Sequence, residues 1–192
     1  SLAYGEDITM GSTNRTFYST RGTSTGVILR YNGTTWDSIC GVPLTYFNAG
    51  AYGRFVYFQR NSPVGQPNTQ VISRLLPDGT LHPIFTDTSL IMSVADIAVD
   101  SIGRVWFFRG TSIGHTSEIT VLDTTGAIVQ SISTTLNNMS TIYGAIFLNG
   151  QLYIGQGTVG AMLYPVNISG NTATLGTPIS IPVTLTDLAN CN

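Results

Sequence analysis

The sequence predicts an all-β fold, a β-propeller of about four four-stranded blades with an extra strand at the C-terminus. Apolar or alternating runs of strand length are separated by Asn-, Asp- and Gly-rich turns, which supply the positive φ angles that hairpins need. The turn glycines Gly33, Gly79, Gly126 and Gly170 follow one another at steps of 46, 47 and 44 residues. A period of about 40–50 residues is typical of propeller blades. No window of helical length has a 3.6-residue period.

The predicted blades occupy residues 1–44, 45–90, 91–138 and 139–181, and each is laid out as four strands. The first strand of a blade is small or aliphatic, which suits the innermost position, where several blades crowd around one axis. The second and third strands are rich in Tyr, Phe, Val and Ile, which suits sheets packed on both faces. The predicted strands cover residues 7–10, 15–19, 27–31, 35–40, 48–51, 54–59, 70–76, 81–86, 96–99, 104–109, 118–122, 128–133, 144–148, 151–155, 161–166 and 172–179.

The connection between the second and third strands is longest in the second and third blades. These inserts, residues 60–69 and 110–117, occupy corresponding positions and are expected to emerge on the same face. Binding residues concentrate on loops that a rigid scaffold holds in place, so this face is predicted to bind.

The C-terminal segment 182–192 repeats the beginning of a blade. Residues 186–189 read Thr-Asp-Leu-Ala, and residues 95–98 read Ala-Asp-Ile-Ala. The segment is interpreted as a strand that closes a four-bladed ring, as the cut edge of a larger propeller, or as a strand offered to a neighbouring subunit. Because edge strands invite aggregation, its pairing matters for the whole fold.

The third unit resembles a known repeat. Asp96-Ile97-Ala98-Val99-Asp100-Ser101-Ile102-Gly103-Arg104-Val105-Trp106-Phe107, followed by Ile119-Thr120-Val121-Leu122-Asp123-Thr124-Thr125-Gly126, is similar to the core of NHL and virginiamycin-B-lyase-like propellers. The resemblance implies the architecture. Lyases of that family are expected to use a His and a Glu with a metal ion, and no His of this sequence stands in a matching context, so the resemblance does not imply lyase activity.

The composition argues against nucleic acid and anionic membranes as partners. Only 9% of the residues are charged, the net charge is −2, and the eight basic residues are all Arg. Nucleic acid and anionic membranes need basic patches, so neither is expected as a partner. No apolar run reaches the roughly 18–20 residues of a membrane span. The chain starts without Met or a signal peptide and is interpreted as a mature or excised segment.

Cysteines and glycosylation sequons point to an extracellular location. Cys40 and Cys191 are expected to form a disulfide in an oxidising compartment, with two free thiols as the cytosolic alternative. Four sequons begin at Asn14, Asn32, Asn138 and Asn167, in predicted turns or linkers.

Carboxylates open the predicted first strands of several units. Asp7, Asp96 and Asp187 occupy equivalent places and would converge at one mouth of an axial channel, where oxygen ligands suit Ca²⁺. The favoured interpretation is that each accepts turn hydrogen bonds, so no metal site and no cofactor is predicted.

Few residues stand out as ligand-binding. His82 and His115 are the only histidines, and neither has a metal-ligand partner at suitable spacing. The residues proposed to bind are Tyr46, Phe47 and Tyr52, at a blade junction, and His115, in a predicted loop. No nucleophile motif, phosphate loop or carboxylate pair is recognisable.

The predicted function is a non-catalytic binding or structural module of the cell surface or the extracellular space, which the sequons would allow to be glycosylated. Its expected partners are a protein or glycan at the cell surface, or copies of itself. One alternative is a subunit of a repeating extracellular fibre joined through its terminal strand. The other is a carbohydrate-active or lyase-type propeller enzyme.

Overall fold

The computed structural model describes most of the chain, and it consists there of strands and turns. The all-β prediction is confirmed, and none of the described segments forms an apolar helix of membrane-spanning length. The described residues are 7–11, 16–21, 26–31, 33–42, 46–61, 69–88, 96–112, 115–136, 142, 144–156 and 161–182. Side chains are described for 28–31, 33–39, 48–59, 69–88, 96–109, 118–134, 142, 144–156 and 161–182.

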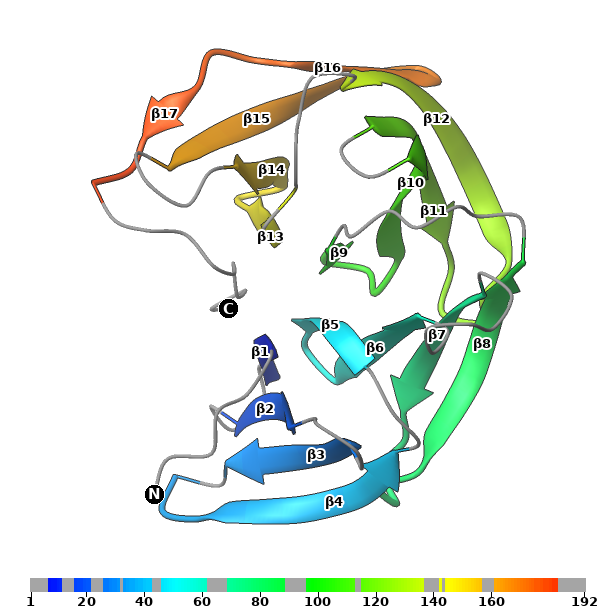
Figure 1. The fold of residues 1–192 in the computed structure, drawn as a ribbon, viewed down its shortest axis with the longest axis vertical. Helices are drawn as coiled ribbons and strands as arrows, with labels where there is room; N and C mark the ends of the chain where they lie inside the picture. The colour runs from blue at the N-terminus through cyan, green and yellow to red at the C-terminus, as the bar shows by residue number, and fades with distance from the viewer. Residues whose placement is uncertain are drawn as a thin grey trace. The chain divides into compact units, whose positions relative to one another are not determined.

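The described strands form two compact units, of which the first contains β1–β8 (Figure 1). It holds two antiparallel four-stranded sheets, and in each sheet neighbouring strands are consecutive in the sequence. The first sheet consists of β1 (Asp7–Gly11), β2 (Thr16–Arg21), β3 (Gly26–Tyr31) and β4 (Trp36–Val42). The second consists of β5 (Tyr46–Tyr52), β6 (Phe55–Asn61), β7 (Gln70–Leu75) and β8 (Leu81–Asp87).

The second unit contains β9–β17, which make one nine-stranded sheet. Its first meander is β9 (Ile97–Val99), β10 (Val105–Ser112), β11 (His115–Leu122) and β12 (Ile128–Leu136). Its second is β13 (Gly144–Leu148), β14 (Gln151–Gln156) and β15 (Met162–Ser169), followed by β16 (Thr172–Leu175) and β17 (Ile179–Ser180). Both β16 and β17 pair with β15, so together they act as an interrupted fourth strand.

Tight turns join the strands where the sequence places them. Gly33, Gly79, Gly126 and Gly170 have φ angles of 103°, 84°, 91° and 59°, as the turn prediction requires. These angles are accessible to glycine at little cost. The turns after β7 and β11 are also held by an aspartate, since Asp78 accepts hydrogen bonds from Thr80, and Asp123 accepts them from Thr125.

Each unit has its own apolar core between successive meanders. In the first unit, Ile28 and Ile39 of one sheet pack against residues of β5–β8: Ala49, Ala51, Val56, Phe58, Leu75 and Leu81. In the second unit, Trp106, Phe108 and Ile119 belong to a cluster that also includes Ala145, Leu152, Ile154, Val166 and Ala173. Four successive residues of β10, Val105 to Phe108, are buried, so both faces of this strand are covered.

The number of separate blades differs from the prediction. The strands fall within the four predicted ranges, but the described strands form three sheets, because Ser133 and Thr134 of β12 pair in parallel with Thr172 and Ala173 of β16. This pairing joins the outer strands of the third and fourth meanders into a nearly closed sheet (Figure 1). A propeller-like all-β fold is therefore confirmed, whereas four separate four-stranded blades are not. The predicted closing segment 183–192 lies outside the described residues, and the single-domain assignment of residues 1–192 stays a prediction.

Candidate functional site

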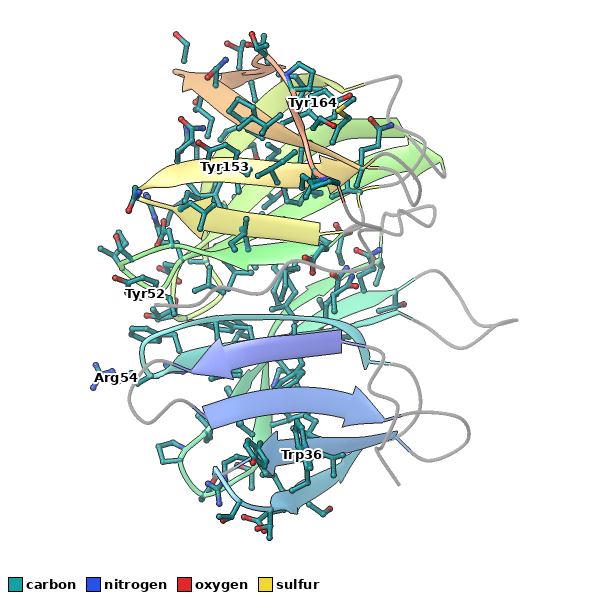
Figure 2. The ribbon with its side chains drawn as sticks, turned by 90° about the vertical axis from the view of Figure 1, so that its left-hand side faces the viewer. Trp36, Tyr52, Arg54, Tyr153 and Tyr164 are labelled. Atoms are coloured by element: carbon teal, nitrogen blue, oxygen red, sulfur yellow. The ribbon has the colours of Figure 1, made fainter. Side chains whose placement is uncertain are left out.

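The residues proposed to bind do not form one described site. Tyr52 ends β5 beside the turn that carries Arg54, and it is half-buried (Figure 2). Tyr46 and Phe47 lie at the start of β5 and His115 at the start of β11, but their side chains are outside the described part. Their role stays a prediction.

Among the three aspartates considered for a metal, Asp96 is the one with a described side chain. It is buried, Oδ1 accepts a hydrogen bond from the Ile97 N–H at 2.8 Å, and Oδ2 accepts one from the Ala145 N–H at 2.7 Å. The carboxylate therefore links the start of β9 to the neighbouring strand β13. Asp7 begins β1, and Asp187 lies outside the described residues. Within the described part, no three His, Cys, Asp or Glu side chains group together as a metal site would require.

The predicted covalent modifications fall mostly outside the described part. Asn14, Asn32 and Asn138 are not described, and neither is Cys191 or the side chain of Cys40. Asn167 is described, and it is an exposed residue of β15, three positions before the turn glycine Gly170. The disulfide and the use of the sequons stay predictions.

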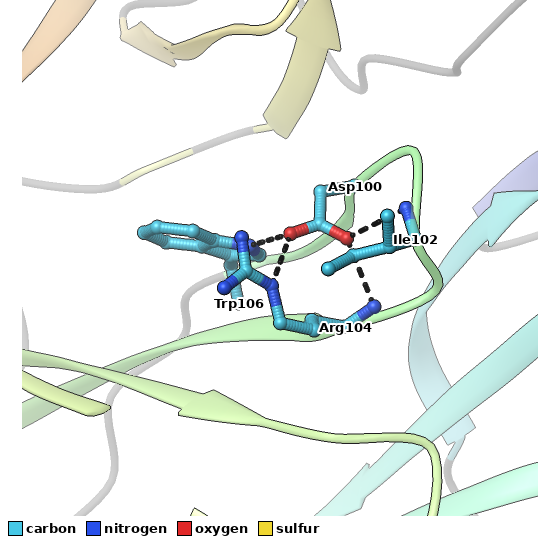
Figure 3. Close-up of polar contacts among 4 residues, drawn as sticks. All are labelled: Asp100, Ile102, Arg104 and Trp106. Carbon is cyan, nitrogen blue, oxygen red and sulfur yellow. Dashed lines mark hydrogen bonds and ion pairs between the residues drawn. The ribbon is translucent and has the colours of Figure 1, made fainter. Parts of the chain in front are cut away.

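Asp100 anchors the turn of the repeat core (Figure 3). Its buried carboxylate accepts hydrogen bonds from the backbone N–H groups of Ile102 at 3.1 Å and Arg104 at 3.0 Å. It also accepts from Arg104 Nε at 2.7 Å and Trp106 Nε1 at 3.0 Å. Both oxygens are thus engaged by two backbone and two side-chain donors. This arrangement stabilises the turn and leaves the carboxylate unsuited to bind a ligand.

A second carboxylate, Glu118 on β11, is partly exposed and is held through one of its oxygens. Its Oε1 accepts a hydrogen bond from Arg109 Nη1 of β10 at 3.0 Å and one from the Thr120 hydroxyl at 2.8 Å. The Glu118 side chain is 33% exposed. No hydrogen bond reaches its Oε2 from the described residues. We call the three residues Glu118, Arg109 and Thr120 the Glu118 cluster.

The corresponding place in the second sheet of the first unit holds neutral amides. Gly53-Arg54 precedes Gln59 by the same spacing as Gly103-Arg104 precedes Arg109. Gln59 accepts a hydrogen bond from Asn48 Nδ2 at 2.9 Å and donates one to Gln70 Oε1 at 3.3 Å. Both sets lie near the strand ends from which the predicted binding inserts leave, and in the second sheet the buried Asp87 of β8 lies opposite Gln70 in the register.

Sequence reasoning did not find the Glu118 cluster. The acidic residues are scattered singly along the chain, and no carboxylate pair is recognisable among them. The available signal was the alternation in β11, where Glu118 and Thr120 interrupt the apolar residues Ile119, Val121 and Leu122. A charged residue in a strand that packs on both faces needs a partner, and Arg109 lies directly opposite in the register.

Several solved structures have a fold similar to that of this chain. No protein-family model matches the sequence, and no curated protein matches it either. A gluconolactonase from Xanthomonas campestris superimposes with a TM-score of 0.53 at 15% identity, over 81% of this chain and 55% of that one. The Malassezia sympodialis allergen Mala s 1 gives 0.56 at 12%, over 89% and 62%. A Lactobacillus plantarum protein gives 0.55 at 11%, over 91% and 55%.

The fold is propeller-like. This chain spans between 55% and 62% of the length of those three structures. At such identities the likeness concerns the fold alone, so the NHL resemblance is supported as a propeller architecture without a match to the NHL family itself.

One prediction is corrected by this comparison. The chain was expected to be non-catalytic because it lacks recognisable catalytic motifs, yet a protein with the same type of fold is a gluconolactonase. The absence of sequence motifs therefore gives no ground for excluding catalysis.

Proposed function

We propose that the chain belongs to a carbohydrate-active propeller hydrolase that opens a neutral sugar lactone. The observation that carries this proposal is the likeness in fold to a gluconolactonase over 81% of the chain. The composition agrees with a neutral, polyhydroxylated substrate, because only 9% of the residues are charged and the polar surface is largely Ser, Thr, Asn and Gln.

Glu118 is the residue proposed to act on the substrate. Arg109 and Thr120 hold its Oε1 by hydrogen bonds, and the side chain is partly exposed, so a general base could accept a proton there. Water adds to the lactone carbonyl carbon while Glu118 accepts a proton from that water. The bond from this carbon to the ring oxygen then breaks, and the ring oxygen takes the proton back from Glu118. The aldonic acid leaves and ionises to the aldonate, which releases one proton to the solvent.

The test is proton release from D-glucono-1,5-lactone, followed in a pH-stat with and without divalent cations. The wild-type chain should exceed the uncatalysed rate, and Glu118→Gln should lower kcat about a hundredfold or more, because an amide cannot accept the proton. Asp123→Asn is the matched control, since it makes the same change of acid to amide in an exposed turn of the same unit. A Glu118→Gln variant with wild-type kcat would exclude Glu118 as the base.

An extracellular location is a further part of the proposal. It is supported by the low charge and by the exposure of Asn167 in its sequon. A mass increase on secretion from a eukaryotic host, abolished by Asn167→Gln, tests it at that position. The fibre subunit stays a prediction, which light scattering of the purified chain would test.

A further inference from the structure

A pocket of about 370 Å³ lies in the first unit, between the β3–β4 hairpin and the turn that joins β7 to β8. Its described lining is mainly polar. Arg30 and Ser38 come from the hairpin and Asp78 from the turn, while Ile39 and Leu75 supply apolar surface. This volume falls within the range of small-molecule sites and accommodates a monosaccharide.

The wall formed by the turn is rigidly held. Leu76 N–H donates to the Thr80 carbonyl at 2.8 Å, and Gly79 N–H donates to the Leu76 carbonyl at 2.9 Å. A Cβ placed on Gly79 would come within 2.9 Å of Ile39 Cγ2, so the turn packs directly against β4. The two walls of the pocket are therefore in contact at this point, and the pocket exists before any ligand binds.

The pocket carries two opposite charges that do not neutralise each other. Asp78 Oδ1 accepts hydrogen bonds from the Thr80 hydroxyl at 2.7 Å and from the Thr80 N–H at 2.9 Å. These two bonds, the hydroxyl first, hold the pKa of the Asp78 carboxyl below its ordinary value, so the group is an anion. Arg30 is exposed, and among the described residues no ion pair joins it to Asp78.

We propose that this pocket binds a sugar acid, such as an aldonate or a uronate. The Arg30 guanidinium receives the ligand carboxylate, which it can bind through two parallel hydrogen bonds. Asp78 Oδ2 and the Ser38 hydroxyl accept hydrogen bonds from ligand hydroxyl groups. The apolar face of the sugar ring covers Ile39 and Leu75.

The lining favours this class over a zwitterionic amino acid. An amino acid with an apolar side chain would need a mainly apolar pocket, whereas polar groups dominate this one. A neutral sugar would form no charge-assisted pair with the Arg30 guanidinium, which a ligand carboxylate does. Sugar acids are also the products of the reaction proposed above, but this binding does not depend on that reaction, and the pocket residues belong to the unit that lacks Glu118.

Calorimetric titration with D-gluconate tests the proposal, with D-glucose and L-leucine as comparison ligands. Gluconate should bind more tightly than either, and the binding should weaken as salt is added. Arg30→Gln should weaken gluconate binding about tenfold, because it removes a charge-assisted contact. Arg30→Lys, which keeps the charge but loses the planar fork, should weaken it less.

Arg54→Gln is the matched control. Arg54 is an exposed arginine of the same unit that projects from the β5–β6 turn and lies outside the pocket lining (Figure 2). Gluconate should bind Arg54→Gln as it binds the wild type. The proposal is overturned if gluconate does not bind, if glucose binds equally well or leucine binds better, or if Arg30→Gln binds like the wild type.

The two proposals can fail separately. Arg30→Gln should retain lactone hydrolysis, and Glu118→Gln should retain gluconate binding. If Arg30→Gln loses gluconate binding and the wild type shows no lactone hydrolysis, the sugar-acid pocket is supported and the catalytic proposal is contradicted.

Discussion

Asp100 shows how a single side chain stabilises the repeat core. Its buried carboxylate satisfies two backbone N–H groups of its own turn, and it also pairs with Arg104 and Trp106. The Arg104 guanidinium carbon lies 5.7 Å from the centre of the Trp106 ring, which adds a cation–π contact to the same cluster. A conspicuous aspartate of the repeat is thus explained by structure rather than by catalysis.

Replacing Asp100 by Ala should destabilise the chain by about 2–4 kcal/mol, because the buried Trp106 Nε1 and the partly buried donors of Arg104 lose their acceptor. Urea unfolding followed by tryptophan fluorescence measures this loss. Asp123→Ala removes an aspartate from an exposed turn and should cost less. Equal losses for the two variants would contradict the role assigned to the Asp100 network.

Asp123 provides a test of turn electrostatics. The Thr125 hydroxyl, and then the Thr125 N–H, lower the pKa of the Asp123 carboxyl below the ordinary value of 3.8. Because the pKa is depressed in the folded chain, the resulting stabilisation is present above the unfolded pKa and is lost as the pH falls through the folded pKa.

Thr125→Val should therefore raise the pKa of Asp123 toward 3.8, and NMR titration of the carboxyl carbon measures the change. Thr124→Val, in the same turn, should leave that pKa unchanged. An unaltered titration of Asp123 in Thr125→Val would show that the hydroxyl bond is absent in solution.

Turn glycines decide how the strands are joined at the scale of the element. Gly33 and Gly79 both have positive φ, but their surroundings differ. A Cβ at Gly33 would meet no atom within 4 Å, whereas one at Gly79 would approach Ile39 Cγ2 at 2.9 Å. Because Cγ2 is attached directly to the branched Cβ of Ile39, it has little freedom to move aside.

Gly79→Ala should accordingly destabilise the chain by about 1–2 kcal/mol more than Gly33→Ala, since both introduce backbone strain but only one introduces a clash. The difference between the two urea unfolding free energies isolates the contact with Ile39. Adding Ile39→Ala to Gly79→Ala should reduce the penalty specific to Gly79. If the two single variants unfold alike, the turn does not pack against β4 as described.

The positions of the strands could be predicted from local patterns, whereas the pairing of β12 with β16 could not. Alternation and turn chemistry placed β5–β8 and β9–β12 within the expected ranges, because both signals act over a few residues. The parallel pairing of Ser133 with Thr172 joins residues far apart in the sequence through only two register positions. No local pattern encodes such a pairing, so four separate four-stranded blades are not confirmed.

The Glu118 cluster could not be predicted from the sequence for the same reason. Glu118 and Arg109 come together because β10 and β11 pair in one register, which places them opposite each other. The sequence displayed the two charges, but it did not display the register that joins them. The pocket in the first unit is a similar case, because Arg30 lies on β3 and Asp78 in the turn between β7 and β8, which belong to different sheets.

At the scale of the molecule, two units with separate cores make up a propeller-like fold. Fold likeness to an enzyme removed the main argument for a non-catalytic module, which was the lack of motifs. The proposed division of roles gives the second unit the catalytic carboxylate and the first unit a sugar-acid pocket. Hydrolysis is the claim on which the functional proposal depends.

The rate of D-glucono-1,5-lactone opening by the purified chain tests that claim most directly. The wild type and Asp123→Asn should both accelerate proton release above the buffer rate, and Glu118→Gln should fall back to near that rate. Lactone opening at the buffer rate by the correctly folded wild-type chain, with divalent cations supplied, would contradict the proposed function.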